Sequence, residues 1–315
     1  MARSPSQSTV SVVICAYTLK RWDDLVAAVE SAQAQGPLEV IVVADHNDEL
    51  LARVRSELPH VHAVANDGPQ GLSGARNAGV AAARGDVIAF LDDDAVATPG
   101  WLDELARCFD NPLVLGAGGA VEPAWAERRP RWFPEEFDWV VGCSYRGLPT
   151  VPAPVRNPIG ANMAVRREVF ATVGGFTSSL GRGGANTMGC EETDFFIRAR
   201  VRVPSAVWLY EPRARVRHRV PRERATLRYF LDRCYGEGKS KALLAGRVGR
   251  PDALSAERRY VLRVLPLGVL NGIRAAGREQ DRFGLARAGA IVAGLAATAA
   301  GYGRGRLHGA NGRAM

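Results

Sequence analysis

Apolar runs alternate with amphipathic segments along the first third of the chain. Val10–Ala16, Val40–Ala44 and Val87–Leu91 are almost wholly apolar, which is typical of parallel strands covered on both faces. Trp22–Gln35 and Gly71–Arg84 lie between them and have helical spacing or a high alanine content. This alternation predicts an α/β fold with a Rossmann-like, doubly wound, mostly parallel sheet.

Polar or exposed positions follow the strands where each one ends. Ala16 ends the first strand and is followed by Tyr17, Asp45 ends the second strand, and Asp94 closes the aspartate run after Val87–Leu91. In open parallel sheets, ligands bind beyond the carboxyl ends of the strands. These positions are therefore expected to meet at one ligand, although Asp45 taken alone also fits a simple turn.

Three consecutive aspartates, Asp92, Asp93 and Asp94, end the central strand. Their carboxylates repel one another unless a positive charge lies among them, and such oxygen ligands suit Mg²⁺ or Mn²⁺. The alternative is a solvated acidic turn that leads into the helix after Thr98.

The segment Gly71–Gly79 reads GLSGARNAG and opens a helix. Its glycines permit close backbone approach, and free N–H groups at a helix N-terminus bind anions. Arg76 opposes the helix dipole there unless an anion is bound. This mismatch favours a phosphate contact over a surface arginine.

A second acidic cluster contains Glu191, Glu192 and Asp194, at the start of a helix that runs to Arg202. Helix capping explains one or two of these acids but not all three. A carboxylate in such a cluster is suited to general acid–base catalysis.

Four stretches in this order resemble the family 2 inverting glycosyltransferases of the GT-A fold: VVICAYT, VVADHND, GLSGARNAG and GDVIAFLDDD. The resemblance covers roughly residues 8–230 and implies a nucleotide-sugar site. It implies that the Ala16–Tyr17 edge and Asp45 lie near the base and ribose and that Arg76 points towards the diphosphate. It also implies that Asp94 faces the metal, with Asp92 or Asp93 holding the ribose or the waters of the metal.

The same resemblance assigns roles in the second half of the chain. The GANM stretch is similar to the segment beneath the donor sugar, so Asn162 is expected to contact a sugar hydroxyl. Glu192 stands where the family has its base, usually an aspartate, and Asp194 and Glu191 are alternatives. His218 resembles a histidine that adds a metal ligand in several GT-A enzymes, and a structural role is the alternative.

Charge is distributed unevenly around the net value of +8. Residues 1–195 carry 16 basic and 25 acidic side chains, and residues 196–315 carry 25 and 8. This pattern does not suit a nucleic-acid binder but fits a segment facing anionic lipid, with arginine-rich codon usage as the alternative. Phe283–Tyr302 approaches the length of a bilayer span, yet its alanines and glycines favour an interfacial or packed helix.

Together these patterns predict a catalytic domain over residues 1–225, with a nucleotide-sugar half (8–115) and an acceptor half (116–225). A basic helical extension (226–315) is expected to follow. The predicted activity is metal-dependent, inverting hexosyl transfer from a nucleotide-sugar, with UDP-sugar favoured, to a lipid-linked or cell-envelope glycan. A sugar nucleotidyltransferase and a non-catalytic glycan- or lipid-binding protein are the alternatives. We see no secretory signal and expect a cytoplasmic protein with peripheral contact to the inner face of the cell membrane.

Overall fold

The computed structural model describes residues 8–178, 190–248, 257–278 and 281–311. Within these ranges the strands are β1 (Val10–Ala16), β2 (Glu39–Ala44), β3 (His62–Ala65), β4 (Val87–Asp92), β5 (Ala95–Ala97), β6 (Val114–Trp125), β7 (Ala153–Pro154), β8 (Asn162–Arg166) and β9 (Val207–Val220). The helices are α1 (Trp22–Gln33), α2 (Asp48–Glu57), α3 (Leu72–Ala82), α4 (Trp101–Cys108), α5 (Arg167–Val173), α6 (Glu191–Arg202), α7 (Leu227–Val248), α9 (Leu265–Arg278) and α10 (Gly284–Asn311). Short helical turns lie at η1 (Leu19–Arg21), η2 (Glu135–Val141), η3 (Arg222–Ala225) and η4 (Tyr260–Val264).

The strands form one mixed sheet in the order β3-β2-β1-β4-β8-β6-β9-β5, with β7 paired to β9. The first strands pair in parallel, β3 with β2, β2 with β1 and β1 with β4. Beyond β4, strands β8 and β6 continue the sheet in antiparallel fashion. The predicted α/β fold with a Rossmann-like parallel portion and a helical C-terminal region is confirmed.

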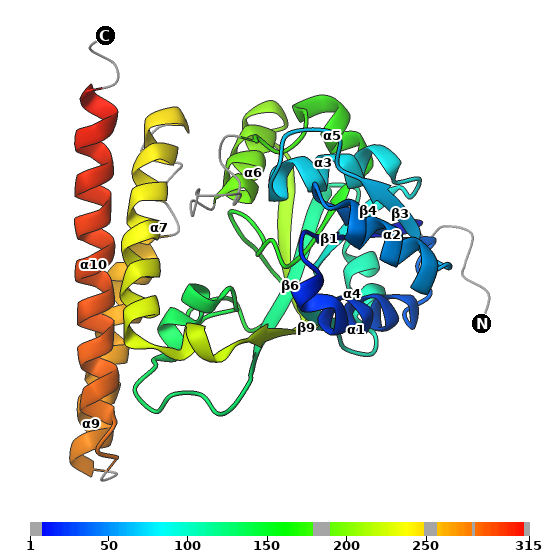
Figure 1. The fold of residues 1–315 in the computed structure, drawn as a ribbon. Helices are drawn as coiled ribbons and strands as arrows, with labels where there is room; N and C mark the ends of the chain where they lie inside the picture. The colour runs from blue at the N-terminus through cyan, green and yellow to red at the C-terminus, as the bar shows by residue number, and fades with distance from the viewer. Residues whose placement is uncertain (1–7, 179–189, 249–256, 279–280, 312–315) are drawn as a thin grey trace. The chain divides into compact units, whose positions relative to one another are not determined.

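Helices cover both faces of this sheet, with α1 and α4 on one side and α3, α5 and α6 on the other (Figure 1). On the second side, Phe90 of β4 packs edge-on against Phe176, with ring centroids 5.6 Å apart. Phe195 of α6 stacks on Phe170 of α5 at 4.9 Å. Successive side chains of β1 and β4 point to opposite faces of the sheet, and nearly all of them are apolar. Both faces are buried, as the apolar sequences of these strands predict.

The chain divides into two compact units. The first comprises residues 1–122, 149–187 and 191–218, and the second comprises residues 123–148, 188–190 and 219–315. The first unit holds the parallel strands with the helices α1 to α6. The predicted boundary near residue 225 remains a prediction.

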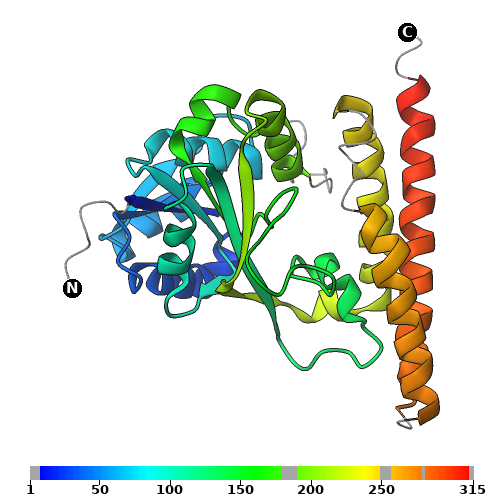
Figure 2. The ribbon, with the colours of Figure 1, turned by 180° about the vertical axis from the view of Figure 1, so that it is seen from behind.

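The second unit is built on helices that lie along one another, with α7 and α9 both packed on α10 (Figure 2). Small residues allow this packing, since a Cβ atom at Gly301 would lie 2.0 Å from the carbonyl oxygen of Tyr235. Within the described residues, Gly284–Leu307 is long and apolar enough to cross a membrane, and 33% of its most apolar window is buried in the fold. Buried helices of soluble proteins also meet this criterion.

Candidate active site

The ends of three parallel strands lie together at the carboxyl edge of the sheet. The register places Ala16 opposite Ala44 and Cys15 opposite Asp92. The backbone N–H of Asp45 donates to the carbonyl of Ala16 at 2.8 Å. Four of the predicted donor-site positions, Ala16, Tyr17, Asp45 and Asp92, therefore share one edge of the sheet.

Asp45 stabilises the loop that leads into α3 through two hydrogen bonds. Its Oδ1 accepts a hydrogen bond from Asn66 Nδ2 at 2.6 Å, and its Oδ2 accepts one from the N–H of Gly71 at 2.9 Å. Gly71 has φ 118°, a conformation that side-chain-bearing residues rarely adopt. A cavity of about 290 Å³, lined partly by Ala44 and Asn66, lies beside this loop.

Arg21 supplies a positive charge beside the Asp92–Asp94 turn. The sequence did not predict this contact. Its Nη1 donates to Asp93 Oδ1 at 2.7 Å and to Asp94 Oδ2 at 2.8 Å. Burial raises the pKa of Asp93 to about 8, although the Arg21 guanidinium acts in the opposite direction. The repulsion among the three aspartates is thus partly offset by a side chain from η1, about 70 residues earlier in the chain.

Asp92, Asp94 and His218 form a candidate metal centre. Each offers one ligand atom, and these atoms lie within 4.8 Å of one another. Strand pairing brings Asp94 and His218 together, because β5 follows Asp94 directly and its Ala95 lies opposite His218 on β9. His218 Nε2 lies 3.1 Å from Asp94 Oδ1. Two carboxylates and an imidazole fit Mn²⁺ or Mg²⁺, so the residues present suit the predicted ion.

If His218 binds the ion, replacing it with alanine removes one ligand while both aspartates remain. We expect His218→Ala to raise the Mn²⁺ concentration that gives half-maximal activity by about tenfold or more. The control is His60→Ala, because His60 is exposed and lies in the turn after α2. A manganese titration of each purified variant measures the effect, and an unchanged requirement in His218→Ala would show that the histidine is structural.

Arg76 connects the two acidic clusters. It is 3% exposed, its Nη1 donates to Glu191 Oε1 at 2.9 Å, and its Nη2 lies 3.8 Å from Asp92 Oδ1. Burial lowers the pKa of Arg76, but the carboxylates of Glu191 and Asp92 more than offset this, so the net pKa shift is upward. The two acid-rich turns, about a hundred residues apart in sequence, therefore flank one buried cation.

The acids at the start of α6 have different surroundings. Asp194 is buried and its Oδ2 accepts from Thr177 Oγ1 and from Arg198 Nε, both at 2.8 Å. Glu191 pairs with Arg76, and its buried Oε2 has no hydrogen-bond partner among the described residues. Glu192 is the partly exposed member of the three. α6 begins at Glu191, so all three acids lie in its first turn.

Asn162 is fully buried and joins three segments of the first unit. Its Oδ1 accepts from Trp101 Nε1 at 2.8 Å. Its Nδ2 donates to the carbonyls of Ala120 at 3.0 Å and Ala214 at 2.9 Å. Because Asn162 is 0% exposed, the predicted contact with a sugar hydroxyl would require the segments around it to move apart.

Because these bonds join α4, β6 and β9, Asn162→Ala should destabilise the protein. The change leaves the Trp101 Nε1 and two carbonyl oxygens without their partner, and we expect a loss of about 3 kcal/mol in the free energy of unfolding. Asn111→Ala is the control, since Asn111 is exposed at a turn, and should cost less than about 1 kcal/mol. Urea unfolding measures both, and equal losses would contradict a supporting role for Asn162.

Comparison with known proteins identifies the family. Residues 11–174 match the family described as glycosyl transferase family 2. A glucosyl-dolichyl phosphate glucuronosyltransferase of Haloferax volcanii is 36% identical over 241 residues, which cover 75% of this chain and 77% of that protein. The succinoglycan biosynthesis protein ExoM of Rhizobium meliloti is 26% identical over 246 residues, covering 75% and 74%. The chain belongs to glycosyl transferase family 2.

Two solved structures share the fold. A mannosyltransferase from Pyrobaculum calidifontis, solved with GDP-Man and Mn²⁺, has a TM-score of 0.57 at 16% identity, over 93% of this chain and 88% of that one. GalNAc-T7, solved with UDP, GalNAc and Mn²⁺, has a TM-score of 0.52 at 21% identity and covers 68% of this chain. This chain spans only 43% of that structure. The fold is GT-A, as the sequence predicts.

The protein is therefore a glycosyltransferase that uses a nucleotide-sugar. Family membership sets aside the two alternatives, a sugar nucleotidyltransferase and a non-catalytic binding protein. The roles of single residues do not follow from the comparisons and are developed below as proposals.

Proposed function

We propose that this protein is a metal-dependent, inverting glycosyltransferase that moves a hexosyl group from a UDP-sugar to a hydroxyl of a lipid-linked or cell-envelope glycan. The observation that carries the proposal is the contact of Arg76 with both Glu191 and Asp92. This contact brings a candidate base cluster and a candidate metal centre together at the carboxyl edge of the sheet. An inverting transfer needs the base on one face of the anomeric carbon and the metal, with the leaving diphosphate, on the other.

On the donor side, the cavity beside β2 and β3 receives the base, and the Ala16–Tyr17 edge and Asp45 lie near the base and ribose. Tyr17 suits this role because its side chain is 58% exposed. Asp92, Asp94 and His218 hold the ion. When bound, Mn²⁺ or Mg²⁺ stabilises the negative charge that develops on the leaving diphosphate.

Arg76 contributes on both sides of the site. Its pairing with Glu191 fixes the first turn of α6, and its approach to Asp92 supplies positive charge where the diphosphate departs. Arg21 holds Asp93 and Asp94 in place before the donor enters. Both arginines thus reduce the repulsion that would otherwise push the aspartates apart.

Glu192 takes the proton of the acceptor hydroxyl as that oxygen attacks the anomeric carbon. Glu192 is partly exposed and can reach an acceptor, whereas Glu191 and Asp194 are buried. One displacement inverts the anomeric centre, so an α-linked donor yields a β-linked product.

The proposed acceptor and location rest on one relative and on an apolar helix of the second unit. The relative from Haloferax volcanii is named for a dolichyl phosphate substrate, and Gly284–Leu307 meets the length and apolarity of a membrane helix. We infer a polyprenyl-linked acceptor and a protein held at the inner face of the cell membrane. The basic side chains of residues 196–315 suit that anionic surface.

A donor screen tests the proposal. Purified protein is incubated with UDP-, GDP- and dTDP-sugars, with and without Mn²⁺, and hydrolysis of the donor and thermal stabilisation are measured. We expect a UDP-sugar to raise the unfolding temperature only when Mn²⁺ is present. Stabilisation by GDP- or dTDP-sugars alone would reassign the nucleotide, and no response to any of the donors would contradict the proposed activity.

A further inference from the structure

Two adjacent residues after β2, His46 and Asn47, tie together segments around a cavity of the first unit. They connect β2 to α2, and both line this cavity of about 290 Å³. Neither was a candidate from the sequence. Their neighbour Asp45 stabilises the loop on one side of the cavity, and each of the two bonds to a further position.

His46 holds the loop between β3 and α3. Its Nε2 lies 2.9 Å from the carbonyl oxygen of Gly68. A carbonyl oxygen only accepts, so Nε2 carries the hydrogen and donates it. The N–H of Gly68 donates to Asn66 Oδ1 at 3.0 Å, and Asn66 Nδ2 donates to the carbonyl of Pro69 at 3.0 Å. The loop is thus closed by Asn66 and tied to the end of β2 by His46.

The backbone of His46 has a conformation that is unfavourable for a residue with a side chain. Its φ is 49°, and among the described residues other than glycine only Cys190 also has a positive φ. Such strain persists where surrounding contacts hold it, and it is frequent at functional sites. A strained residue whose side chain ties down a loop beside a cavity suggests a role in ligand binding.

Asn47 joins the same corner to the end of β1. Its Oδ1 accepts from the N–H of Leu50 at 2.9 Å and so caps α2. Its Nδ2 donates to the carbonyl of Tyr17 at 3.1 Å. Tyr17 directly follows β1, and its side chain is exposed. The amide of Asn47 therefore holds the backbone of a residue whose ring is accessible to a ligand.

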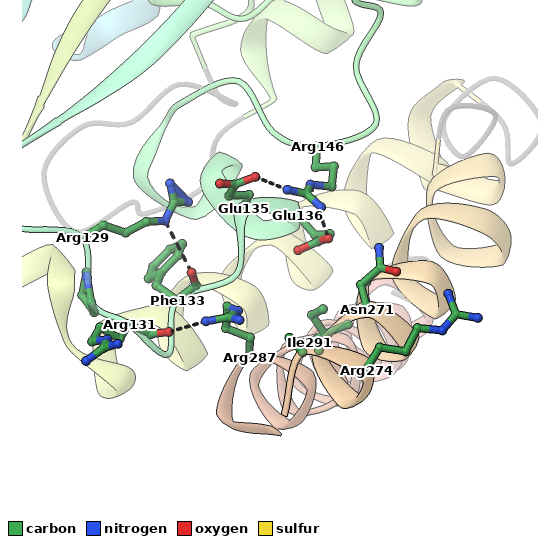
Figure 3. Close-up of a pocket in the computed structure, with 14 residues that line it drawn as sticks. Arg129, Arg131, Phe133, Glu135, Glu136, Arg146, Asn271, Arg274, Arg287 and Ile291 are labelled. Atoms are coloured by element: carbon green, nitrogen blue, oxygen red, sulfur yellow. Dashed lines mark hydrogen bonds and ion pairs between the residues drawn. The ribbon is translucent and has the colours of Figure 1, made fainter. Parts of the chain in front are cut away.

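The larger cavity of the second unit, of about 680 Å³, has a different lining (Figure 3). Three of its arginines, Arg129, Arg146 and Arg287, are paired with acids of the same unit. Figure 3 shows Arg131 and Arg274 on opposite sides, with their guanidinium groups pointing away from each other. The arginines of this lining do not converge on one anion, whereas the contacts of His46 and Asn47 surround a single cavity.

We propose that His46 and Asn47 are positioning residues of the donor site, which hold Tyr17 and the loop of residues 66–71 in place before the nucleotide binds. The inference rests on the proposed nucleotide-sugar site at this edge of the sheet and adds the residues that shape it. A loop that is already ordered loses less conformational entropy when its ligand binds, so the ligand binds more tightly.

Replacing His46 with asparagine tests the contact with Gly68. The amide nitrogen of asparagine is one bond nearer to Cα than Nε2 of histidine and falls short of the carbonyl, while asparagine still tolerates a positive φ. We expect the Kd of UDP, measured by calorimetry with Mn²⁺, to rise about fivefold or more, because affinity falls with the fraction of molecules whose loop is in place. Turnover at saturating donor should change less than about twofold.

A rescue variant and a control accompany this change. His46→Gln places an amide nitrogen as many bonds from Cα as Nε2 and should restore most of the affinity. His60→Asn makes the asparagine change at an exposed histidine after α2 and should leave the Kd unchanged. Thermal unfolding checks that the variants are folded, and equal losses in folded His46→Gln and His46→Asn would overturn the role of this hydrogen bond.

Replacing Asn47 with serine tests the second contact independently. The serine hydroxyl still caps α2, but the amide that reaches Tyr17 is lost. We expect the Kd of UDP to rise about threefold or more, with turnover retained. Asn111→Ser is the control, because the Asn111 side chain accepts a local hydrogen bond from the N–H of Leu113.

Hydrogen exchange without nucleotide separates positioning from direct contact. We expect the amides of residues 66–71 to exchange about fivefold faster or more in His46→Asn than in the wild type. A weaker affinity with unchanged exchange would show that His46 contacts the nucleotide itself and would overturn the positioning role.

Titration of UDP, GDP and dTDP into the wild type keeps this inference distinct from the proposed function. If GDP or dTDP binds in place of UDP, the UDP assignment fails, while losses of that nucleotide's affinity in His46→Asn and Asn47→Ser still support the positioning role. Unchanged affinity in both variants, with UDP bound by the wild type, refutes the positioning role alone. Binding of none of the three nucleotides refutes both.

Discussion

Replacing Glu192 with glutamine is expected to lower the turnover number by about a hundredfold or more, because the amide cannot accept the proton of the acceptor hydroxyl. Glutamine preserves the shape of the side chain, so the donor should bind as tightly as before. Steady-state kinetics with saturating acceptor give the turnover, and titration with UDP gives the donor affinity.

Matched variants show whether the effect belongs to Glu192. Glu168→Gln makes the same change in the first turn of α5, where Glu168 is exposed, and should leave turnover unchanged. Glu191→Gln and Asp194→Asn test the alternative bases. A near-normal rate in Glu192→Gln together with a large loss in Asp194→Asn would move the base to Asp194.

Replacing Asp94 with asparagine is expected to lower activity at least about a hundredfold, since the amide is a weaker ligand for a divalent cation and the charge on the leaving diphosphate is then less well stabilised. Part of the loss should return at high Mn²⁺ concentration, because the oxygen ligand remains. Removing the metal with a chelator should abolish activity in the wild type, and adding Mn²⁺ back should restore it.

Asp110→Asn controls for the change of an acid to an amide, because Asp110 is exposed at the end of α4. It should leave the metal requirement unaltered. Asp94→Asn also removes a partner of Arg21, so thermal unfolding of the variant is measured in the absence of metal. Activity in Asp94→Asn equal to that of the wild type at every Mn²⁺ concentration would contradict the metal role.

The first half of the fold was predictable because its sequence signals are local. β1, β2 and β4 are apolar runs of the length that a buried parallel strand needs, and their observed bounds differ from the predicted ones by at most one residue. β8 was not predicted because Asn162–Arg166 is short and contains only one β-branched residue, Val165. Most of β9 (Val207–Val220) was not predicted, although its exposed arginines alternate with buried residues, which is the pattern of a half-buried strand.

The acids of the site were predictable and their partners were not. Three adjacent aspartates repel one another unless a positive charge lies among them. On this ground alone, the sequence predicted a metal ion at Asp92–Asp94. The same requirement is met in part by Arg21, whose position beside the turn depends on how η1 packs and leaves no trace in sequence spacing. Likewise, the ion pair of Arg76 with Glu191 joins residues 115 positions apart, a separation at which only the folded chain brings them together.

A crystal structure with Mn²⁺ and UDP tests most directly whether the two acidic clusters form one catalytic centre. We predict an anomalous manganese peak bounded by Asp92, Asp94 and His218, with the diphosphate beside Arg76 and the Glu192 carboxylate facing the space left for the sugar. Manganese bound elsewhere, or a nucleotide whose diphosphate points away from α6, would contradict the account.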